Sequence, residues 1–510
     1  MTQSINRNSL RHKLGKFGIC GKFLKIITSI YQSTKVSLSY NQKISAPFDT
    51  SIGLKQGDVL STIFFNLFIN DLPSILGNQS THFDENETPE ICKENVSSLL
   101  FADDLAMFSL TQKGLQNKLD ILQNYCSQWD LNLNLKKTKI MIFNKQGATI
   151  KKFKFFFKGE EIDVVNQYTY LGFTFIPSGK KHVGIENLIK KGKKAWFSIQ
   201  KMLNKSKEKT IGTYLKLIDS LVKPIILYAC ESWGDSLKKG VFSNKIEQFH
   251  ISMCKQVMGV CKFTSNIKVL AELGRMPLKI DIETKMFKYL QRMPFIEKHR
   301  FLYKAFKEDE SEKIGWVRNM KSVLDNLGLS NLMLNIFKTI DGVIPQEEYE
   351  NKENFFKKRN TDQYYQTFYN YIDRTEDRGF FMRIKEKYEK ERYLEINNIE
   401  LRTALSKLRL SSYKLAVVTG KWNKTKLEDR KCQFCNSNEV EDEFHLLFQC
   451  SNYDSIRKEL IDYLITNENI DITSENKFEN LKLVFSNGSF RSLKALGKFV
   501  FEAFEKRNKS

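Results

Sequence analysis

The chain has 510 residues, of which 41% are apolar and 12% aromatic, so it can bury several hydrophobic cores and is not a disordered polymer. Its low content of proline and glycine excludes collagen-like and low-complexity chains. Lysine and arginine outnumber aspartate and glutamate by 81 to 59, a net charge of +22, which favours a polyanionic partner. A basic surface kept only for solubility is the alternative.

The N-terminal residues lack the apolar core of a secretory signal, and the longest apolar stretch, Val59–Ile69, is too short to span a bilayer. Nine cysteines are scattered along the chain, and without an export signal we expect reduced thiols. We therefore expect an intracellular protein of the nucleus or cytoplasm with no membrane partner. The oligomeric state stays open.

The first predicted elements are a helix, a hairpin and a second helix. The first helix, Lys22–Tyr31, is expected to pack through four apolar residues: Phe23, Ile26, Ile27 and Ile30. The hairpin has turn residues at Asn41 and Gly53. Asp58 is the expected N-cap of the second helix, which should end near Pro73.

After a polar loop over residues 77–96, a short hairpin is predicted in "SSLLFADDLAMFSL", Ser97–Leu110, because two apolar runs flank Ala102-Asp103-Asp104. Two adjacent carboxylates repel one another, and a cation between them would relieve that repulsion. On these residues alone, the alternative is that aspartate is simply a common turn residue.

A helix and two further strand candidates complete this part of the chain. The helix is predicted from an apolar stripe at helical spacing: Leu115, Leu119, Leu122, Cys126 and Trp129. The strand candidates cover residues 131–143 and 168–176. The order of elements suits an antiparallel sheet backed by helices, which is the α+β class.

Four motifs in this region, in matching order and spacing, resemble the reverse transcriptase of non-LTR (LINE-type) retrotransposons. "GLKQGDVLSTIFFNLFINDL" resembles the Gln-Gly segment that lies along the template, and "FADD" resembles the aromatic-X-Asp-Asp hairpin. "NLKKTK" resembles the segment near the incoming triphosphate, and "YLG" resembles the primer-grip turn. "LYACESWG" and "ELGRMPL" extend the similarity beyond a polymerase palm.

The resemblance implies an RNA-directed DNA polymerase that binds an RNA template, a DNA primer and a dNTP. It assigns Mg²⁺ to Asp103 and Asp104, whose hard oxygens suit this ion and two-metal phosphoryl transfer. It assigns the leaving pyrophosphate to Lys137 or Lys139. The implied template or nucleotide contacts are Gln56, Gly57 and Phe101, and the implied primer grip is Tyr170, Leu171 and Gly172.

One departure concerns the other metal-binding aspartate, which the family supplies from an earlier Asp-X-X-X-X-aromatic strand. Ser4–Arg7 match the tail of that region, so this aspartate, the fingers and the usual endonuclease would precede Met1. Asp49, Asp58 and Asp71 lack the family's context. The resemblance implies the C-terminal part of an element, with little polymerase activity of this chain alone. The alternative is a non-catalytic nucleic-acid-binding remnant.

Lysines crowd a predicted amphipathic helix within Lys180–Lys209. The resemblance makes it the thumb, with four lysines expected on the nucleic-acid backbone: Lys190, Lys191, Lys193 and Lys194. A solvated basic face or a nuclear-import signal are alternatives. Residues 220–237 are an expected buried helix with Trp233 in the core, and residues 285–400 are expected to be mostly helical without assigned chemistry.

Near the C-terminus, Cys432, Cys435, His445 and Cys450 form the pattern C-x2-C-x9-H-x4-C. Three thiolates and one imidazole make a closed tetrahedral set for Zn²⁺, which would be structural. Three reduced core cysteines beside a helical histidine are the alternative.

The expected architecture is a partial right-hand polymerase palm with a helical thumb, a helical C-terminal region and a small zinc module. Its parts are a palm over residues 1–178, a basic thumb over 179–300, a mostly helical region over 301–425, a zinc module over 426–465 and a helical tail over 466–510.

Overall fold

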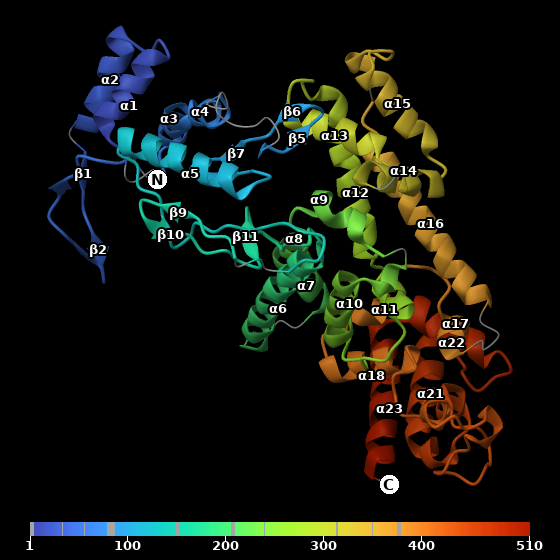
Figure 1. Cartoon of the computed structure of the whole chain (residues 1–510). Helices are drawn as coiled ribbons and strands as arrows, with labels where there is room; N and C mark the ends of the chain where they lie inside the picture. The colour runs from blue at the N-terminus through green and yellow to red at the C-terminus, as the bar shows by residue number, and fades with distance from the viewer. Residues whose placement is uncertain are drawn as a thin grey trace. The chain divides into compact units, whose positions relative to one another are not determined.

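The computed structural model describes residues 5–32, 34–55, 57–78, 87–148, 150, 152–205, 210–238, 240–312, 315–348, 350–374 and 379–509 (Figure 1). The chain divides into two compact units, which are taken in turn. Unit 1 comprises Met1–Val183 and Ile296–Lys313, and unit 2 comprises Gly184–Phe295 and Ile314–Ser510.

Unit 1 mixes helices with short antiparallel strand pairs. Its helices are α1 (Arg7–Lys16), α2 (Gly21–Gln32), α3 (Val59–Ile69), α4 (Leu72–Asn78), α5 (Gln112–Gln128) and α13 (Phe301–Ser311). Its strand pairs are β1 (Lys35–Val36) with β4 (Phe48–Asp49), β2 (Ser39–Tyr40) with β3 (Lys43–Ile44), β5 (Glu90–Ile91) with β6 (Glu94–Asn95), β7 (Ser98–Phe101) with β8 (Asp104–Met107), β9 (Phe156–Phe157) with β10 (Glu160–Glu161), and β11 (Tyr168–Tyr170) with β12 (Phe173–Phe175). The expected mixture of helices and antiparallel strands is confirmed. The expected single palm sheet is not: among the described residues, every sheet has two strands.

The core of unit 1 lies between α1, α3 and α5. The stripe predicted on α5 is confirmed, since Leu119, Leu122 and Cys126 are buried and Trp129, just beyond the helix, joins them. Phe68 of α3 meets the Trp129 ring edge-on, with centroids 6.0 Å apart.

The face of α2 that packs differs from the prediction. Ile27 is buried, but Phe23, Ile26 and Ile30 are 60%, 48% and 37% exposed. The helix turns Ile27 and Tyr31 inward instead, because Tyr31 lies against Phe64 and bonds Ser61 on α3. Apolar residues on two sides of one helix cannot all face a single core, and periodicity alone does not choose between the sides.

The helix that follows Asp58 does not end near Pro73. It breaks at Asn70–Asp71, and α4 then starts with Pro73 in its first turn, where the missing N–H is tolerated. By length and composition, Val59–Gly77 is apolar enough to cross a membrane, with a mean hydropathy of 1.5, contrary to the expectation for this stretch. Phe64, Phe65 and Phe68 are packed in the core of unit 1, and a core helix meets the same criteria.

Two other expectations in unit 1 need correction. Residues 131–143 form no strand; they make turns, and Ile140 alone forms an isolated bridge with Val164. Asn134 accepts backbone hydrogen bonds from Lys137 and Thr138, which bends the chain away from an extended course. The predicted loop over residues 77–96 contains the β5–β6 hairpin in its described part.

Unit 2 is helical throughout its described residues. Its helices are α6 (His182–Lys205, which begins at the end of unit 1), α7 (Ile211–Leu217), α8 (Lys223–Ile226), α9 (Cys230–Trp233), α10 (Lys245–Met258), α11 (Asn266–Glu272), α12 (Leu278–Leu290), α14 (Trp316–Asn326), α15 (Ser330–Ile340), α16 (Glu353–Arg374), α17 (Phe380–Ile384), α18 (Ile399–Arg409), α19 (Ala416–Trp422), α20 (Glu443–Phe448), α21 (Asp454–Glu468), α22 (Lys477–Ser486) and α23 (Phe490–Lys509). The helical prediction for residues 285–400 is confirmed.

The predicted continuous helix over residues 220–237 is instead broken into short pieces. A π-helical turn precedes α8, and Ala229 has a left-handed φ of 52° before α9 begins. Trp233 is fully buried, as predicted.

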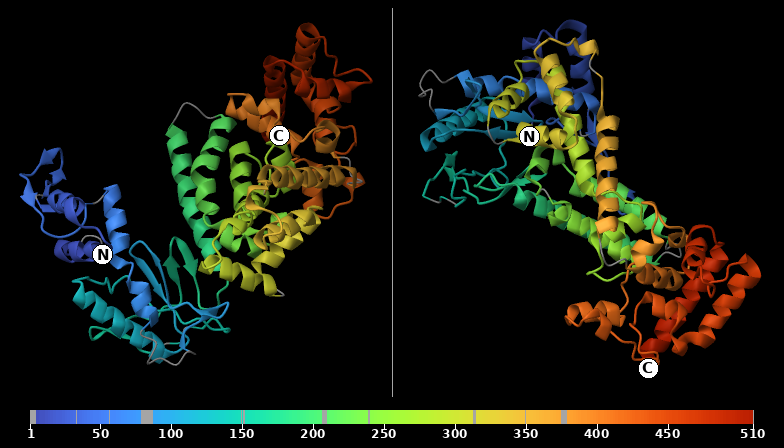
Figure 2. Two further views of the ribbon diagram at one scale, coloured as in Figure 1. Left: turned by 90° about the horizontal axis from the view of Figure 1, so that it is seen from above. Right: turned by 90° about the vertical axis from the view of Figure 1, so that its right-hand side faces the viewer.

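A buried ion-pair cluster ties the centre of unit 2 together. Arg409 on α18 and Glu272 on α11 are buried and ion-paired, and Glu391 bonds both Arg409 and the buried Lys385. The long helix α23 packs along α18 and α21 in the C-terminal part of the unit (Figure 2).

Candidate functional site

The adjacent acids Asp103 and Asp104 lie at the tip of the β7–β8 hairpin. Phe101 pairs with Asp104, so Ala102 and Asp103 form a two-residue turn, with a left-handed φ of 51° at Ala102. Both carboxylates are exposed, whereas Ser98 at the other end of the hairpin is buried. The predicted hairpin is confirmed, and it presents two carboxylates together on a paired backbone.

The predicted primer-grip residues form a second hairpin turn. Leu171 and Gly172 connect β11 to β12 with left-handed φ values of 45° and 83°. Burial and, to a lesser degree, the negative charge of Asp104 raise the pKa of Tyr170.

The two predicted pyrophosphate lysines are placed differently. Lys139 is ion-paired with Asp163, at 2.5 Å from Nζ to Oδ2. Lys137 is exposed, and its carbonyl oxygen accepts a hydrogen bond from the Tyr168 hydroxyl at 3.1 Å. The Lys137 amine is therefore the better placed of the two to reach a ligand.

Two of the three predicted template residues are described by the structure. Gln56 falls outside the described residues. Gly57 has a left-handed φ of 84°, and a Cβ there would meet open space, so backbone conformation alone requires glycine. Phe101 is 64% exposed beside the acidic turn. Asp58, the predicted N-cap, accepts from the Leu60 N–H at the start of α3.

Arg7 is a positioning residue that the sequence analysis did not identify. Its guanidinium is buried and donates hydrogen bonds to the carbonyl oxygens of Tyr31, Thr50, Ile52 and Gly53, and to the Thr50 hydroxyl. It thus holds the backbone that leads into Gly57. The position of Arg7 in the "SINR" motif was the only hint of its role available in the sequence. Its hydrogen-bond acceptors lie more than 20 residues away, so no local sequence pattern indicates them.

Two of the three other acids considered as metal ligands have structural partners. Asp71 accepts from the buried Lys13 amine and from the Tyr125 hydroxyl, each at 2.7 Å. Asp58 caps α3, and Asp49 lies in the exposed strand β4.

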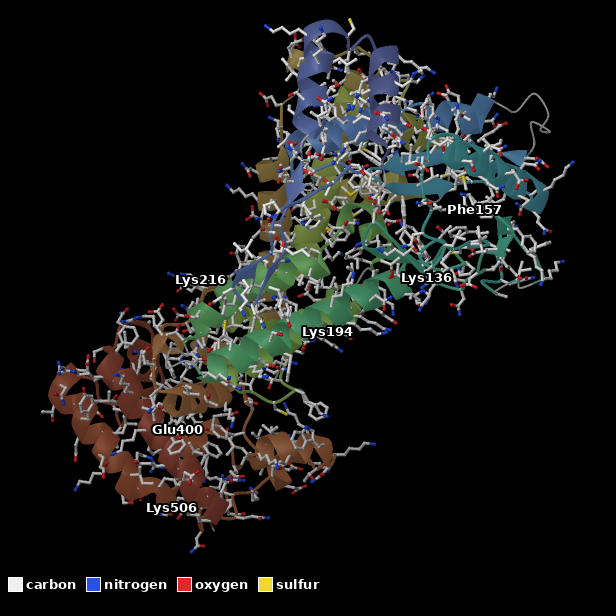
Figure 3. The ribbon with its side chains drawn as sticks, turned by 90° about the vertical axis from the view of Figure 1, so that its left-hand side faces the viewer. Lys136, Phe157, Lys194, Lys216, Glu400 and Lys506 are labelled. Atoms are coloured by element: carbon white, nitrogen blue, oxygen red, sulfur yellow. The ribbon has the colours of Figure 1, made fainter. Side chains whose placement is uncertain are left out.

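The basic helix α6 has one apolar and one basic side. Leu188, Trp196, Ile199 and Leu203 are buried, and the Trp196 N–H donates to Gln256 at 2.9 Å. The four predicted backbone-binding lysines are all exposed: Lys190, Lys191, Lys193 and Lys194. Lys194 is labelled on this helix in Figure 3. The amphipathic prediction is confirmed.

The four predicted zinc ligands come together in unit 2. One ligand atom from each of Cys432, Cys435, His445 and Cys450 lies within 4.8 Å of all the others. The two cysteines of the C-x2-C pair belong to a turn closed by the Lys431–Val440 bridge. His445 lies on α20, and Cys450 follows that helix.

The polar groups around this cluster suit a bound metal ion. His445 Nδ1 lies 3.1 Å from Glu439 Oε2, so Nε2 faces the thiols and lies 3.3 Å from Cys435 Sγ. Burial raises the pKa of the Cys435 thiol, but hydrogen bonds with Ser437, Cys432 and Cys450 together outweigh it and lower the pKa to about 6. A thiolate, which is the form that binds metal, is thereby favoured at this position.

The sequence of unit 1 is similar to known proteins. Residues 3–175 match the family model described as "Reverse transcriptase (RNA-dependent DNA polymerase)". The chain is 28% identical over 188 residues to the Retrovirus-related Pol polyprotein from type-2 retrotransposable element R2DM of Drosophila melanogaster, covering 35% of this chain and 17% of that protein. It is 30% identical over 191 residues to the Retrovirus-related Pol polyprotein from type-1 retrotransposable element R2 of Popillia japonica, covering 36% and 31%.

A longer but weaker similarity reaches into unit 2. The RNA-directed DNA polymerase from mobile element jockey of Drosophila melanogaster is 20% identical over 274 residues, or 52% of this chain and 28% of that protein. The chain thus spans less than a third of the length of each of these relatives.

Proposed function

This chain carries a reverse transcriptase segment of the non-LTR retrotransposon type, and from that premise we propose that it takes part in RNA-directed DNA synthesis on an RNA template with a DNA primer. The observation that carries the proposal is the β7–β8 turn, which presents two adjacent exposed carboxylates within the matched segment.

Asp103 and Asp104 would hold Mg²⁺, which in this chemistry stabilises the attacking and leaving oxygens of the phosphoryl transfer. A carboxylate pair on a hairpin suits this ion, because the paired strands keep the oxygens in place while their exposure leaves room for waters and phosphates. Tyr170, Leu171 and Gly172 would contact the primer end beside this pair. Lys137 would approach the incoming triphosphate, while Lys139 stays with Asp163.

The site as described needs a further carboxylate for two-metal chemistry. Asp58 already caps α3, and Asp71 is already paired with Lys13. We therefore propose that additional polypeptide supplies the further carboxylate. Phe23, Ile26 and Ile30 support this, since they form an exposed apolar stripe on α2 at helical spacing, of the kind that further protein covers.

The remaining parts would bind and brace the nucleic acid. Exposed lysines on α6 would follow phosphates of the template–primer hybrid. Zn²⁺ would be held by Cys432, Cys435, His445 and Cys450, with no open coordination position, and would therefore be structural.

A primer-extension assay tests the catalytic part of this proposal. Purified residues 1–510, given a primed RNA template, Mg²⁺ and dNTPs, should bind the template but extend the primer little or not at all, because one metal carboxylate is absent from the described site. Robust extension that Asp103→Ala abolishes would contradict this, and would assign the missing role to Asp49, Asp58 or Asp71.

The second candidate function is a non-catalytic nucleic-acid-binding protein. It is favoured by the fact that the basic helix α6 and the Cys/His cluster are both formed without any contribution from the acidic hairpin. Binding of a primed template with no metal site at Asp103 and Asp104 would support this second candidate.

A further inference from the structure

Two exposed aromatic rings meet on the surface of unit 2, outside the hairpin, α6 and the zinc cluster. Phe263, in the loop between α10 and α11, is 72% exposed, and Trp422, the last residue of α19, is 54% exposed. Their ring centroids are 6.4 Å apart, with the planes at 59°. Large aromatic side chains are normally buried, so an exposed pair at contact distance indicates a binding surface.

One lysine contacts this pair, and others neighbour it in the sequence. The Lys262 amine lies 4.9 Å from the centroid of the Phe263 ring. Three further exposed lysines flank Trp422 within four residues along the chain: Lys421, Lys424 and Lys426. Two exposed acids, Glu428 and Asp429, follow Lys426, so the three lysines lie nearer to Trp422 in the sequence than the acids do.

The loop that carries Phe263 is anchored by buried and half-buried contacts. The Ser412 hydroxyl, just after α18, accepts from the Cys261 N–H at 2.7 Å and from the Thr264 hydroxyl at 3.1 Å. The Lys255 amine on α10 donates to the Lys262 carbonyl oxygen at 2.8 Å. Phe263 is therefore exposed on a loop that hydrogen bonds hold in place.

The end of α19 is held by the segment that enters the zinc cluster. Arg430 donates to the Val417 carbonyl oxygen at 2.9 Å and to the Thr425 carbonyl oxygen at 2.7 Å, one on each side of Trp422. A Cβ at Gly420 would lie 2.5 Å from Arg430 Cδ, so only glycine admits this contact. Arg430 is two residues before Cys432, which connects the position of Trp422 to the metal centre.

We propose that Phe263 and Trp422 form a stacking platform for unpaired bases of a single-stranded nucleic acid, with Lys262, Lys421 and Lys424 contacting its phosphates. Every base has an apolar face that stacks on aromatic rings, and only unpaired bases expose that face. The positive charge of the neighbouring lysines favours a polyanion over a protein partner. The inference rests on the proposed function only in taking nucleic acid as the partner, because the platform uses none of the residues of the acidic hairpin and none of the four lysines proposed on α6.

The test measures the affinity of the full chain for a fluorescent single-stranded oligonucleotide of about ten nucleotides and for an RNA–DNA hybrid duplex. Phe263→Ala and Trp422→Ala should each weaken single-strand binding about tenfold, which is within the usual range for one stacked base. The affinity for the hybrid duplex should stay unchanged. Phe355→Ala, which removes a 52% exposed ring on α16, is the matched control and should change neither affinity.

Conservative variants separate stacking from general apolar contact. Trp422→Tyr should retain most of the single-strand affinity, because it keeps a ring, whereas Trp422→Leu should lose it although it keeps apolar surface. Single-strand binding should also quench tryptophan emission in the wild type and not in Trp422→Tyr. Circular dichroism of each variant reports whether it is folded.

Three results would overturn the platform. Unchanged single-strand affinity in folded Trp422→Ala would do so, as would an equal loss for the hybrid duplex. Retention of affinity by Trp422→Leu would instead indicate an apolar protein-binding surface. Failure of the proposed function would instead appear as loss of hybrid binding in the wild type, so it is distinguishable from failure of the platform, which these variants report.

Discussion

Arg7 is the residue on which the geometry near Gly57 depends most. One planar guanidinium serves five acceptors spread over Tyr31 and Thr50–Gly53, and it does so from a buried position. Lysine has one compact charge and cannot reproduce this fork of donors.

We therefore expect Arg7→Lys to lower the free energy of unfolding of unit 1 by about 2–4 kcal/mol, because several buried carbonyl oxygens lose their partner. Urea denaturation monitored by circular dichroism measures the change. Lys25→Ala, an exposed change on the neighbouring α2, should stay within about 0.5 kcal/mol of the wild type. Equal midpoints for Arg7→Lys and the wild type would show that the guanidinium is dispensable.

At the scale of elements, the sequence predicted local structure better than packing. The α5 stripe and the two-residue turn at Ala102-Asp103 follow from spacing and turn chemistry that lie within a few residues. The single strand expected over residues 168–176 was wrong, since it is a hairpin that turns at Leu171-Gly172, where only the resemblance indicated a turn. The clustering of Cys432, Cys435, His445 and Cys450 was also predictable, because their residue types and spacing are typical of metal binding. The exposed side of α2 was not, since it depends on which neighbours the helix meets. The roles of Arg7, Lys139 and Asp71 depend on partners distant in the sequence and leave no periodic signal.

The basic helix α6 gives a prediction about salt. Reversal of Lys190, Lys191, Lys193 and Lys194 to glutamate should flatten the dependence of hybrid-duplex affinity on salt, because each phosphate contact contributes a slope of about 0.9 in a log–log plot. Filter binding at several salt concentrations measures the slope. The control reverses two exposed lysines elsewhere, Lys458 on α21 and Lys494 on α23. The change in slope is divided by the number of charges reversed before the two variants are compared. An unchanged slope in the α6 variant would mean that these lysines form only a solvated face.

The zinc cluster gives a prediction about metal content. Protein purified without chelator should contain one zinc per chain, and Cys435→Ser should release it, because the metal would join the C-x2-C turn to α20 and its binding energy would add to folding. Limited proteolysis should then cut residues from about 425 to 465 while the β7–β8 hairpin stays intact. Elemental analysis and mass spectrometry of the fragments measure both effects.

Cys20→Ser, which changes an exposed thiol far from the cluster in the sequence, is the control and should keep the metal. A metal-free protein with the protease pattern of the wild type would show that the four residues are only core side chains.

For the whole molecule, the central claim is that Asp103 and Asp104 form the metal-binding end of a nucleotidyl-transfer site. The claim joins the match to a reverse transcriptase family model over residues 3–175 to the exposed carboxylate pair of the β7–β8 turn. A metal site at these acids distinguishes the proposed polymerase from a protein that only binds nucleic acid. Binding of a primed template does not distinguish them, because both would bind it.

Iron-directed backbone cleavage tests this claim most directly. With a primed RNA template bound and Fe²⁺ in place of Mg²⁺, ascorbate and peroxide should cut the chain beside Asp103–Asp104 and near Tyr170. The double change Asp103→Asn with Asp104→Asn should abolish these cuts, whereas Asp120→Asn, an exposed acid on α5, should leave them. Absence of cleavage at the hairpin, or cleavage that the double change leaves intact, would contradict the account and make the two acids ordinary turn residues.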